Sequence, residues 1–233
     1  MTFDGQSASS GPSDRVPAAV AGALHGRELL SHPFYRRWEA GDLSLEELGR
    51  YAGQYRAFEA ALPELLGTIH ASLMADEAVE AAELIARNLA DELGAPEPHV
   101  ALFDRFAAAV GTEPDAPAGP AARSLVATHR DLAADGAVRA LAALAAYETQ
   151  ASAIASTKAD GLRRWYGIDT GGAAFWDVHA TMEADHGAGA LAALAALDAD
   201  PADVAEAARV GADAWWAFLD ERQAEAPSDR VLS

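Results

Sequence analysis

The distribution of proline along this chain restricts the fold that it can adopt. The 233 residues include 11 prolines, but none occurs between residues 121 and 200. Because the interior of a helix excludes proline, these residues mark most of the joints between helices, and the proline-free stretch can hold long ones. Alanine, the strongest helix former, makes up about a quarter of the chain, and runs of β-branched residues are missing. The sequence therefore predicts an all-α fold.

Prolines, glycines and hydrophobic repeats divide the chain into about seven to eight helices that form one bundle. Apolar residues recur at intervals of three or four from 45 to 62, and Ser44 with Glu47 forms a capping box that begins this helix. Pro63 is expected to kink or restart it, and residues 34–41 are expected to be turn-rich. The expected helices cover residues 16–30, 45–73, 76–93, 98–110, 121–134, 136–158, 172–197 and 201–224.

Most of the chain is expected to form one domain. We expect a helical domain over residues 15–225, between disordered tails at residues 1–14 and 226–233. The N-terminal tail is rich in serine, glycine and proline and lacks the apolar segment of a signal peptide. No window approaches the ~18–20 apolar residues that a membrane helix needs. These features predict a cytoplasmic protein without a membrane partner.

Charge and the lack of cysteine limit the chemistry of the chain. The 17 Lys and Arg against 36 Asp and Glu give a formal net charge of -19, which argues against nucleic acid or an anionic membrane as a partner. Without cysteine there can be no disulfide, no thiolate nucleophile and no cysteine-ligated zinc or iron–sulfur cluster. A metal site in this chain must use histidine, carboxylates or water.

The segment from His179 to His186 carries the strongest local signal for chemistry. At ~100° per residue, His179, Glu183 and His186 fall within one arc of about 60° on a helix. The neighbouring Phe175 and Trp176 indicate that this helix is largely buried. A buried helix seldom has three ionisable groups on one side without a charge partner, and a divalent cation is one such partner. The alternative is a solvent-exposed face with scattered histidine and glutamate.

Three further residues could complete such a site. Glu148 is the only charged residue in the stretch 140–155, where a lone carboxylate either reaches the surface or is held by a positive group inside. Glu92 and His99 are separated by a glycine/proline joint, so Glu92 closes one helix and His99 opens the next. Both can then face the same interior point, although Glu92 taken alone could equally be a solvated surface acid.

Together these residues form a coherent set of nitrogen and oxygen ligands. Three carboxylates carry a charge of −3 and two divalent cations carry +4, a near balance that suits a buried two-metal site. Such ligation fits iron, manganese or zinc. The six candidate ligands are Glu92, His99, Glu148, His179, Glu183 and His186.

With these residues, the sequence resembles the haem-oxygenase-like di-metal oxidases and oxygenases, relatives of thiaminase II and of pyrroloquinoline quinone synthase. In that family the six positions are the metal ligands of a bundle that binds no haem. The resemblance implies two iron ions or a mixed manganese–iron pair, O2 as co-substrate, an external reductant and a homodimer. It rests on Asn88-Leu-Ala-Asp-Glu92-Leu-Gly followed by His99, on Tyr147-Glu148, and on His179-x3-Glu183-x2-His186.

Within this family the chain resembles the death-domain-associating proteins, which are self-sacrificing p-aminobenzoate synthases. They are understood to convert one of their own tyrosines into p-aminobenzoate, a folate precursor, with O2 at the metal site and a lysine implicated in supplying nitrogen. The resemblance implies that Tyr35 is the consumed tyrosine, that Lys158 is this lysine, and that Tyr51 and Tyr55 lie near them. Glu183 departs from the pattern, because close relatives carry aspartate there.

These four residues also have purely structural explanations. Tyr35 could be an aromatic anchor of the core with its hydroxyl group satisfied, and Tyr51 and Tyr55 are four residues apart, which is core spacing on a helix. Lys158 ends a predicted helix, where a cation is favourable against the helix dipole in any protein.

The leading hypothesis is an O2-dependent di-metal oxidoreductase of the p-aminobenzoate synthase kind, with its own tyrosine as substrate. One alternative is a di-iron oxygenase or desaturase that acts on an external amino acid or fatty acid, which the same scaffold supports. Others are a cofactor-free oxidase similar to pyrroloquinoline quinone synthase and a binding protein without catalytic activity. Thiaminase activity is disfavoured because that branch relies on a cysteine nucleophile.

Overall fold

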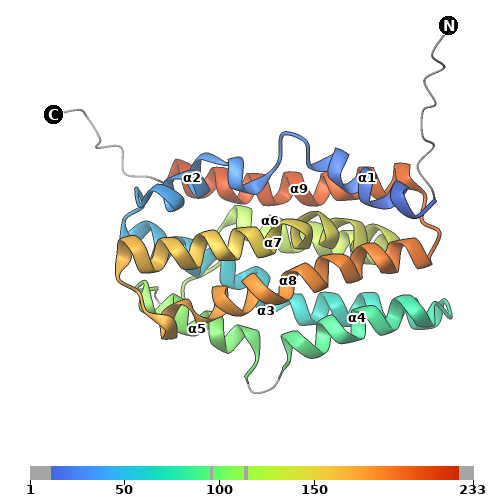
Figure 1. Cartoon of the computed structure of the whole chain (residues 1–233), viewed down its shortest axis with the longest axis horizontal. Helices are drawn as coiled ribbons and strands as arrows, with labels where there is room; N and C mark the ends of the chain where they lie inside the picture. The colour runs from blue at the N-terminus through green and yellow to red at the C-terminus, as the bar shows by residue number, and fades with distance from the viewer. Residues whose placement is uncertain (1–11, 95–96, 113–114, 226–233) are drawn as a thin grey trace, which may run out of the picture.

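The computed structural model describes residues 12–94, 97–112 and 115–225, and every regular element within them is helical (Figure 1). The predicted all-α class is confirmed. These residues form nine α-helices and one 3-10 turn, so the predicted number of helices is too low. None of these helices combines the length and apolar character that a membrane crossing demands. In chain order the elements are α1 (Pro12–Leu24), η1 (Leu29–Ser31), α2 (Pro33–Ala40), α3 (Leu45–Ala75), α4 (Val79–Glu92), α5 (His99–Ala109), α6 (Pro120–Asp135), α7 (Ala137–Tyr166), α8 (Thr170–Ala196) and α9 (Pro201–Ala224).

The N-terminal helix begins earlier than the sequence indicated. α1 starts at Pro12, so residues 12–14 are helical although they were expected to belong to the tail. Proline suits the first position of a helix because its missing N–H would have no partner there and its φ is already near the helical value. The rest of the expected N-terminal tail and the expected C-terminal tail at 226–233 lie outside the described residues.

The segment 34–41, expected to be turn-rich, forms most of the helix α2. Pro33 occupies the first turn, the His32 side chain accepts a hydrogen bond from the Phe34 N–H, and Gly41 ends the helix with a φ of 76°. These capping interactions at both ends stabilise a helix of only 8 residues. α2 carries the first of the tyrosines singled out in the sequence.

α3 is assigned as one helix although Pro63 lies inside it. The predicted capping box is present: the Ser44 side chain accepts a hydrogen bond from the Glu47 N–H, and Glu47 Oε2 accepts one from the Ser44 N–H at 2.8 Å. The apolar stripe of α3 continues across the proline, with Leu62 and Leu66 buried. This packing keeps both halves in one helix, because tertiary contacts supply most helical stability in proteins.

The long helix α7 runs through the middle of the bundle. It packs against α8 and α9, while α3 packs against α4 and α6. In Figure 1, α1, α2 and α9 lie along one side of α7, whereas α4, α5 and α8 lie along the other. The helices α4, α5, α7 and α8 all contribute to the site described below.

Small residues allow α7 to approach its neighbours closely. A Cβ atom at Gly211 of α9 would lie 2.9 Å from the Cβ of Ala143, and one at Gly187 of α8 would lie 3.1 Å from the backbone of Glu148. Neither glycine has a positive φ, so the close approach of another helix is what requires it. Gly187 thus brings the α8 backbone directly against a candidate metal ligand on α7.

Candidate metal centre

The six candidate ligands lie together in the interior of the bundle. Glu92 ends α4 and His99 begins α5, while Glu148 lies within α7 and the other three lie on α8. All six side chains are buried. They form two groups in which one nitrogen or oxygen atom of each residue lies within 4.8 Å of the others: the first triad, Glu92, His99 and His179, and the second triad, Glu148, Glu183 and His186.

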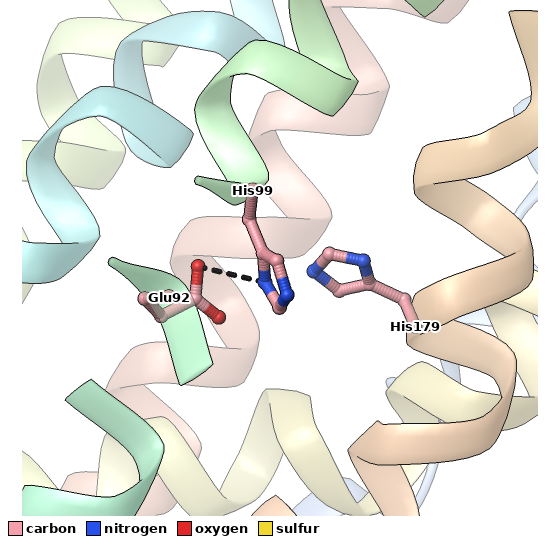
Figure 2. A group of neighbouring side chains, drawn as sticks. All are labelled: Glu92, His99 and His179. Carbon is pink, nitrogen blue, oxygen red and sulfur yellow. Dashed lines mark ion pairs between the residues drawn. The ribbon is translucent and has the colours of Figure 1, made fainter. Parts of the chain in front are cut away.

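In the first triad, two imidazole rings and a carboxylate converge from three helices. Figure 2 shows the rings of His99 and His179 turned toward each other, with their centres 4.6 Å apart, and Glu92 Oε2 lies 3.1 Å from His99 Nδ1. His179 Nδ1 donates a hydrogen bond to the Phe175 carbonyl oxygen at 2.8 Å, so its Nε2 keeps a lone pair. Burial, helped by His99, lowers the pKa of His179 to about 3, which favours the neutral form that binds metal.

In the second triad, two carboxylates lie beside one imidazole. Glu183 Oε2 lies 3.8 Å from His186 Nδ1, and Glu148 Oε1 accepts a hydrogen bond from Asn88 Nδ2 at 2.7 Å. Burial raises the pKa of Glu148 to about 8, against the effect of the Asn88 hydrogen bond. Burial also raises the pKa of Glu183 well above its ordinary value, with the charges of Glu148 and Glu92 adding to the rise. Both shifts reflect the cost of burying carboxylates close together, which a bound cation removes.

The two triads are adjacent and could hold a pair of cations. His179 Nε2 lies 3.6 Å from Glu183 Oε1. Buried polar atoms are normally paired, so each exception needs an explanation. Lone pairs on imidazole nitrogen and carboxylate oxygen are the donors that iron, manganese and zinc accept, and the residues present fit such a pair. Among the six candidate ligands, the buried side-chain atoms that make no hydrogen bond within the described residues are His99 Nδ1, Glu148 Oε2, Glu183 Oε2 and His186 Nδ1.

A second buried group contains three of the four residues assigned a catalytic role by resemblance. The Lys158 amine donates a hydrogen bond to the Tyr51 hydroxyl at 2.6 Å, and the hydroxyl groups of Tyr51 and Tyr35 are 2.9 Å apart. Lys158 Nζ also lies 4.5 Å from the centre of the Tyr35 ring and 3.9 Å from that of Trp176. The structure therefore places the amine between the two tyrosines.

Lys158 lies within α7, which continues to Tyr166, and not at a helix end as the sequence indicated. The helix dipole therefore does not explain its position. Its side chain is 1% exposed, and burial lowers the pKa of the amine well below its ordinary value, against the charge of Glu59. Burial likewise raises the pKa of Tyr35 above its ordinary value. Burial thus favours a neutral amine beside neutral phenols, and a neutral amine is nucleophilic.

Comparison with known proteins identifies the family. A family model described as iron-containing redox enzymes matches residues 49–216, more than half of the chain. The chain belongs to this family. The 4-aminobenzoate synthase of Nitrosomonas europaea is 36% identical to it over 216 residues, which cover 86% of this chain and 88% of the relative. The 4-aminobenzoate synthase of Chlamydia muridarum is 32% identical over 150 residues, which cover 62% of each chain.

These relationships confirm the predicted family and its oxidoreductase class. A crystal structure of a CADD-like protein of unknown function from Nostoc punctiforme matches this redox enzyme with a TM-score of 0.76 at 19% identity, covering 92% of this chain and 98% of that one. At that identity the match supports the fold alone. Together with the family model, it confirms the predicted haem-oxygenase-like bundle.

Tyr55 belongs to the same aromatic region of the enzyme but has a different hydrogen-bond partner. Its hydroxyl lies 2.6 Å from that of Tyr147, while its ring contacts that of Tyr51 at 5.6 Å between centres. The sequence alone indicated no role for Tyr147, although this residue directly precedes Glu148. Tyr147 therefore links the aromatic region to the α7 ligand along the chain.

Glu59 is a buried acid that was not among the residues expected from the sequence to form the site. It is 3% exposed, and its Oε1 makes no hydrogen bond within the described residues. Burial raises its pKa well above the ordinary value, the charge of Glu92 adds to the rise, and Lys158 opposes it. A signal was present in the sequence, because Glu59 lies four residues after Tyr55 and three before Leu62, on the buried face of α3.

Aromatic side chains of the enzyme connect the tyrosine–lysine group to the candidate metal ligands. Trp176, which lies against the Lys158 amine, precedes His179 by one turn of α8. The ring centre of Phe175 is 3.9 Å from that of His179 and 4.7 Å from that of Trp176. These ring contacts join the two groups through apolar side chains, with the buried Glu59 close to both.

Proposed function

We propose that this enzyme is an O2-dependent di-metal p-aminobenzoate synthase that consumes one of its own tyrosines. The observation that carries the proposal is the position of Lys158. A buried primary amine lies between Tyr51 and Tyr35, and the aromatic rings beside it extend to the candidate ligand His179. The name shared by the bacterial relatives, 4-aminobenzoate synthase, supports the proposal because 4-aminobenzoate and p-aminobenzoate are the same compound.

We assign one cation to each triad. Glu92, His99 and His179 would hold the first, and the remaining three ligands would hold the second. Bound metal would supply the reduction of O2 and the oxidising power for the reaction, with electrons from an external reductant. Iron is favoured by the description of the family, and a mixed manganese–iron pair remains the alternative.

The chemical difference between tyrosine and p-aminobenzoate defines what the protein must do. Tyrosine carries a hydroxyl group para to Cβ, whereas p-aminobenzoate carries an amino group para to a carboxyl group. The conversion therefore replaces the phenol oxygen by nitrogen, breaks the Cα–Cβ bond and oxidises Cβ to the carboxyl carbon. The nitrogen must come from close to the ring, and Lys158 Nζ lies 4.5 Å from the centre of the Tyr35 ring.

Tyr35 and Tyr51 take different roles in this proposal. Tyr35 is the consumed residue, and the Tyr51 hydroxyl lies within hydrogen-bond distance of both the Tyr35 hydroxyl and the Lys158 amine. A proton can move between Tyr35 and Lys158 through this hydroxyl. Burial of all three side chains excludes water, which would otherwise compete with the amine for the ring.

Isotope labelling tests the proposal. Protein grown with ring-labelled tyrosine is loaded anaerobically with Fe(II) and a reductant and then exposed to air, and small molecules and peptides are analysed by mass spectrometry. We expect labelled p-aminobenzoate, no more than one molecule per chain, and loss of mass at Tyr35. Tyr35→Phe should abolish the product, whereas Tyr166→Phe should not, because Tyr166 lies outside the tyrosine–lysine group.

Other outcomes point to other functions. Labelled product with an intact Tyr35 would transfer the substrate role to another tyrosine, with Tyr51 the first to examine. A Tyr35→Phe enzyme that still oxidises an added amino acid or fatty acid would favour the external-substrate oxygenase. The cytoplasmic location and the homodimer belong to the proposal as well, and size-exclusion chromatography with light scattering tests the dimer.

A further inference from the structure

Asp91 connects the protein surface to the second triad. Its Oδ2 lies 3.1 Å from His186 Nε2, and it directly precedes the candidate ligand Glu92 at the end of α4. The side chain of Asp91 is 44% exposed, whereas that of His186 is 5% exposed. A surface carboxylate therefore reaches in to hold a buried imidazole.

The Asp91 contact determines which nitrogen of His186 can bind a cation. Because an ionised carboxylate only accepts hydrogen bonds, His186 Nε2 carries the proton and Nδ1 keeps the lone pair. Nδ1 lies 3.8 Å from Glu183 Oε2, makes no hydrogen bond within the described residues and is buried. The imidazole is thus in the tautomer that presents Nδ1 to the second triad.

The two α8 histidines are held in different ways. His179 donates its Nδ1–H to the Phe175 carbonyl oxygen in the preceding turn, so helical backbone sets its tautomer and leaves Nε2 for binding. His186 depends on the side chain of Asp91 from another helix. A single substitution at Asp91 can therefore alter the second triad without altering the hydrogen bond that holds His179 in the first.

Two surface cavities meet at Asp91. One of ≈ 300 Å³ lies between α4 and α8 and is lined in part by Asn88, Asp91, Asp185 and His186. The other, of ≈ 370 Å³, reaches the first triad and is lined in part by Asp91 and His99. Asp91 is therefore next to the solvent paths toward both triads, while its hydrogen bond reaches only His186 among the six candidate ligands.

We propose that Asp91 is a positioning residue that sets the affinity of the second triad for its cation by holding His186 with Nδ1 inward. The inference rests on the proposed metal centre and deepens it. Outer carboxylates of this kind hold metal-binding histidines in many proteins, and their loss costs about 10- to 100-fold in metal affinity. The chain should therefore have one cation whose affinity depends on Asp91 and one whose affinity does not.

Asp185 provides a matched control. It lines the same cavity and carries the same charge, but it makes no ion pair with His186 within the described residues. If Asp91 acted only by attracting cations through its negative charge, removing Asp185 would weaken binding to a similar degree. If Asp91 acts through His186, Asp91→Ala and Asp185→Ala should differ. Asp91→Asn keeps an oxygen that can accept the hydrogen bond, and it should fall between the wild type and Asp91→Ala.

The experiment is an anaerobic titration of metal-free protein with Fe(II) against a competing chelator. We expect the wild type and Asp185→Ala each to bind two ions, with affinities that do not differ between these two proteins. In Asp91→Ala, one of the two ions should bind about 10- to 100-fold more weakly than in the wild type. Cobalt(II) substitution supplies a spectroscopic count of the same two sites. The thermal melting temperature of each metal-free variant shows whether the fold is retained. If Asp91→Ala melts at a lower temperature than the wild type, metal binding by Asp91→Asn is compared with the wild type instead.

The remaining outcomes overturn the inference or the centre on which it rests. Normal binding of both ions by Asp91→Ala and Asp91→Asn would overturn the role of Asp91 and leave the metal centre standing. If Asp185→Ala weakened metal binding as much as Asp91→Ala, the effect of Asp91 would be general attraction of cations by its charge and not positioning of His186. Equal weakening of both ions in the Asp91 variants would show that the effect is not specific to His186. A wild-type protein that binds no metal would contradict the proposed centre itself.

Discussion

The amine of Lys158 lies 2.6 Å from the hydroxyl of Tyr51, in a region where both side chains are buried. An ammonium group in such a place is costly, so burial lowers the pKa of Lys158 and favours the neutral amine. The same burial keeps the neighbouring phenols protonated. A lysine that were only structural would more often carry its charge to the surface.

Lys158→Met tests the role of the amine. Methionine keeps much of the apolar stem and removes the buried nitrogen, and Tyr51 retains its contact with the Tyr35 hydroxyl. We expect the variant to unfold at the same temperature as the wild type or higher, with a gain of about 1 kcal/mol, because a buried polar group is removed. It should bind metal normally and form no p-aminobenzoate. Continued formation of labelled product would show that the nitrogen comes from elsewhere.

Two glycines of α8 give a paired test of the close helix approach at the metal centre. A Cβ at Gly187 would lie 3.1 Å from the backbone of Glu148, whereas one at Gly189 would meet no described atom within 4 Å beyond the neighbouring backbone of its own helix. We expect Gly187→Ala to destabilise the protein by about 1–3 kcal/mol and to weaken metal binding, because α7 and α8 must move apart. Gly189→Ala should stabilise it by about 0.5–1 kcal/mol through helix propensity. Chemical denaturation measures both, and equal stabilities would contradict the close packing.

The stability of the metal-free enzyme should depend on pH through Glu148. Burial raises the pKa of Glu148 from 4.5 to about 8, so the folded protein holds a proton that the unfolded chain has lost in this range. The bound proton therefore contributes to the free energy of unfolding. This contribution is fully present below about pH 4.5 and is lost as the pH rises to about 8, at up to about 1.4 kcal/mol per pH unit. Comparing the denaturation midpoints of the wild type and Glu148→Gln over this range isolates the contribution. Parallel curves for the two proteins would contradict the raised pKa.

Glu59 should influence the pH dependence of the reaction. When ionised, Glu59 opposes the effect of burial on the pKa of Lys158. Glu59→Gln removes this negative charge, so the pKa of Lys158 should decrease. The pH at which the rate of product formation rises should therefore shift to a lower value. Glu64→Gln is the control, because Glu64 lies on the same helix but pairs with Arg130 at the surface. Superimposable pH profiles for wild type and Glu59→Gln would show that Glu59 does not act on the amine.

Local patterns in the sequence predicted most of the helices and indicated the candidate ligands. The spacing of His179, Glu183 and His186 places them on one side of a helix by geometry alone, and the structure has them on α8. The capping box and the long proline-free stretch likewise predicted helices that the structure contains. These features depend on neighbours within a few residues, which is why they can be read from one sequence. α2 was missed because its cap is the side chain of a histidine, which is not a usual helix-capping residue.

Contacts between distant segments were decided only by the tertiary structure. The sequence shows that Asp91 and Glu59 are acids on predicted helices, but one reaches His186 from the surface and the other is buried on the face of α3 that looks inward. The position of Lys158 between two tyrosines requires α2, α3 and α7 to meet. Such contacts depend on how helices pack, and packing follows the shape and volume of side chains that are far apart in the chain. The sequence alone determined which groups are available for chemistry, and the packing of the bundle decided which of them meet and in which protonation state.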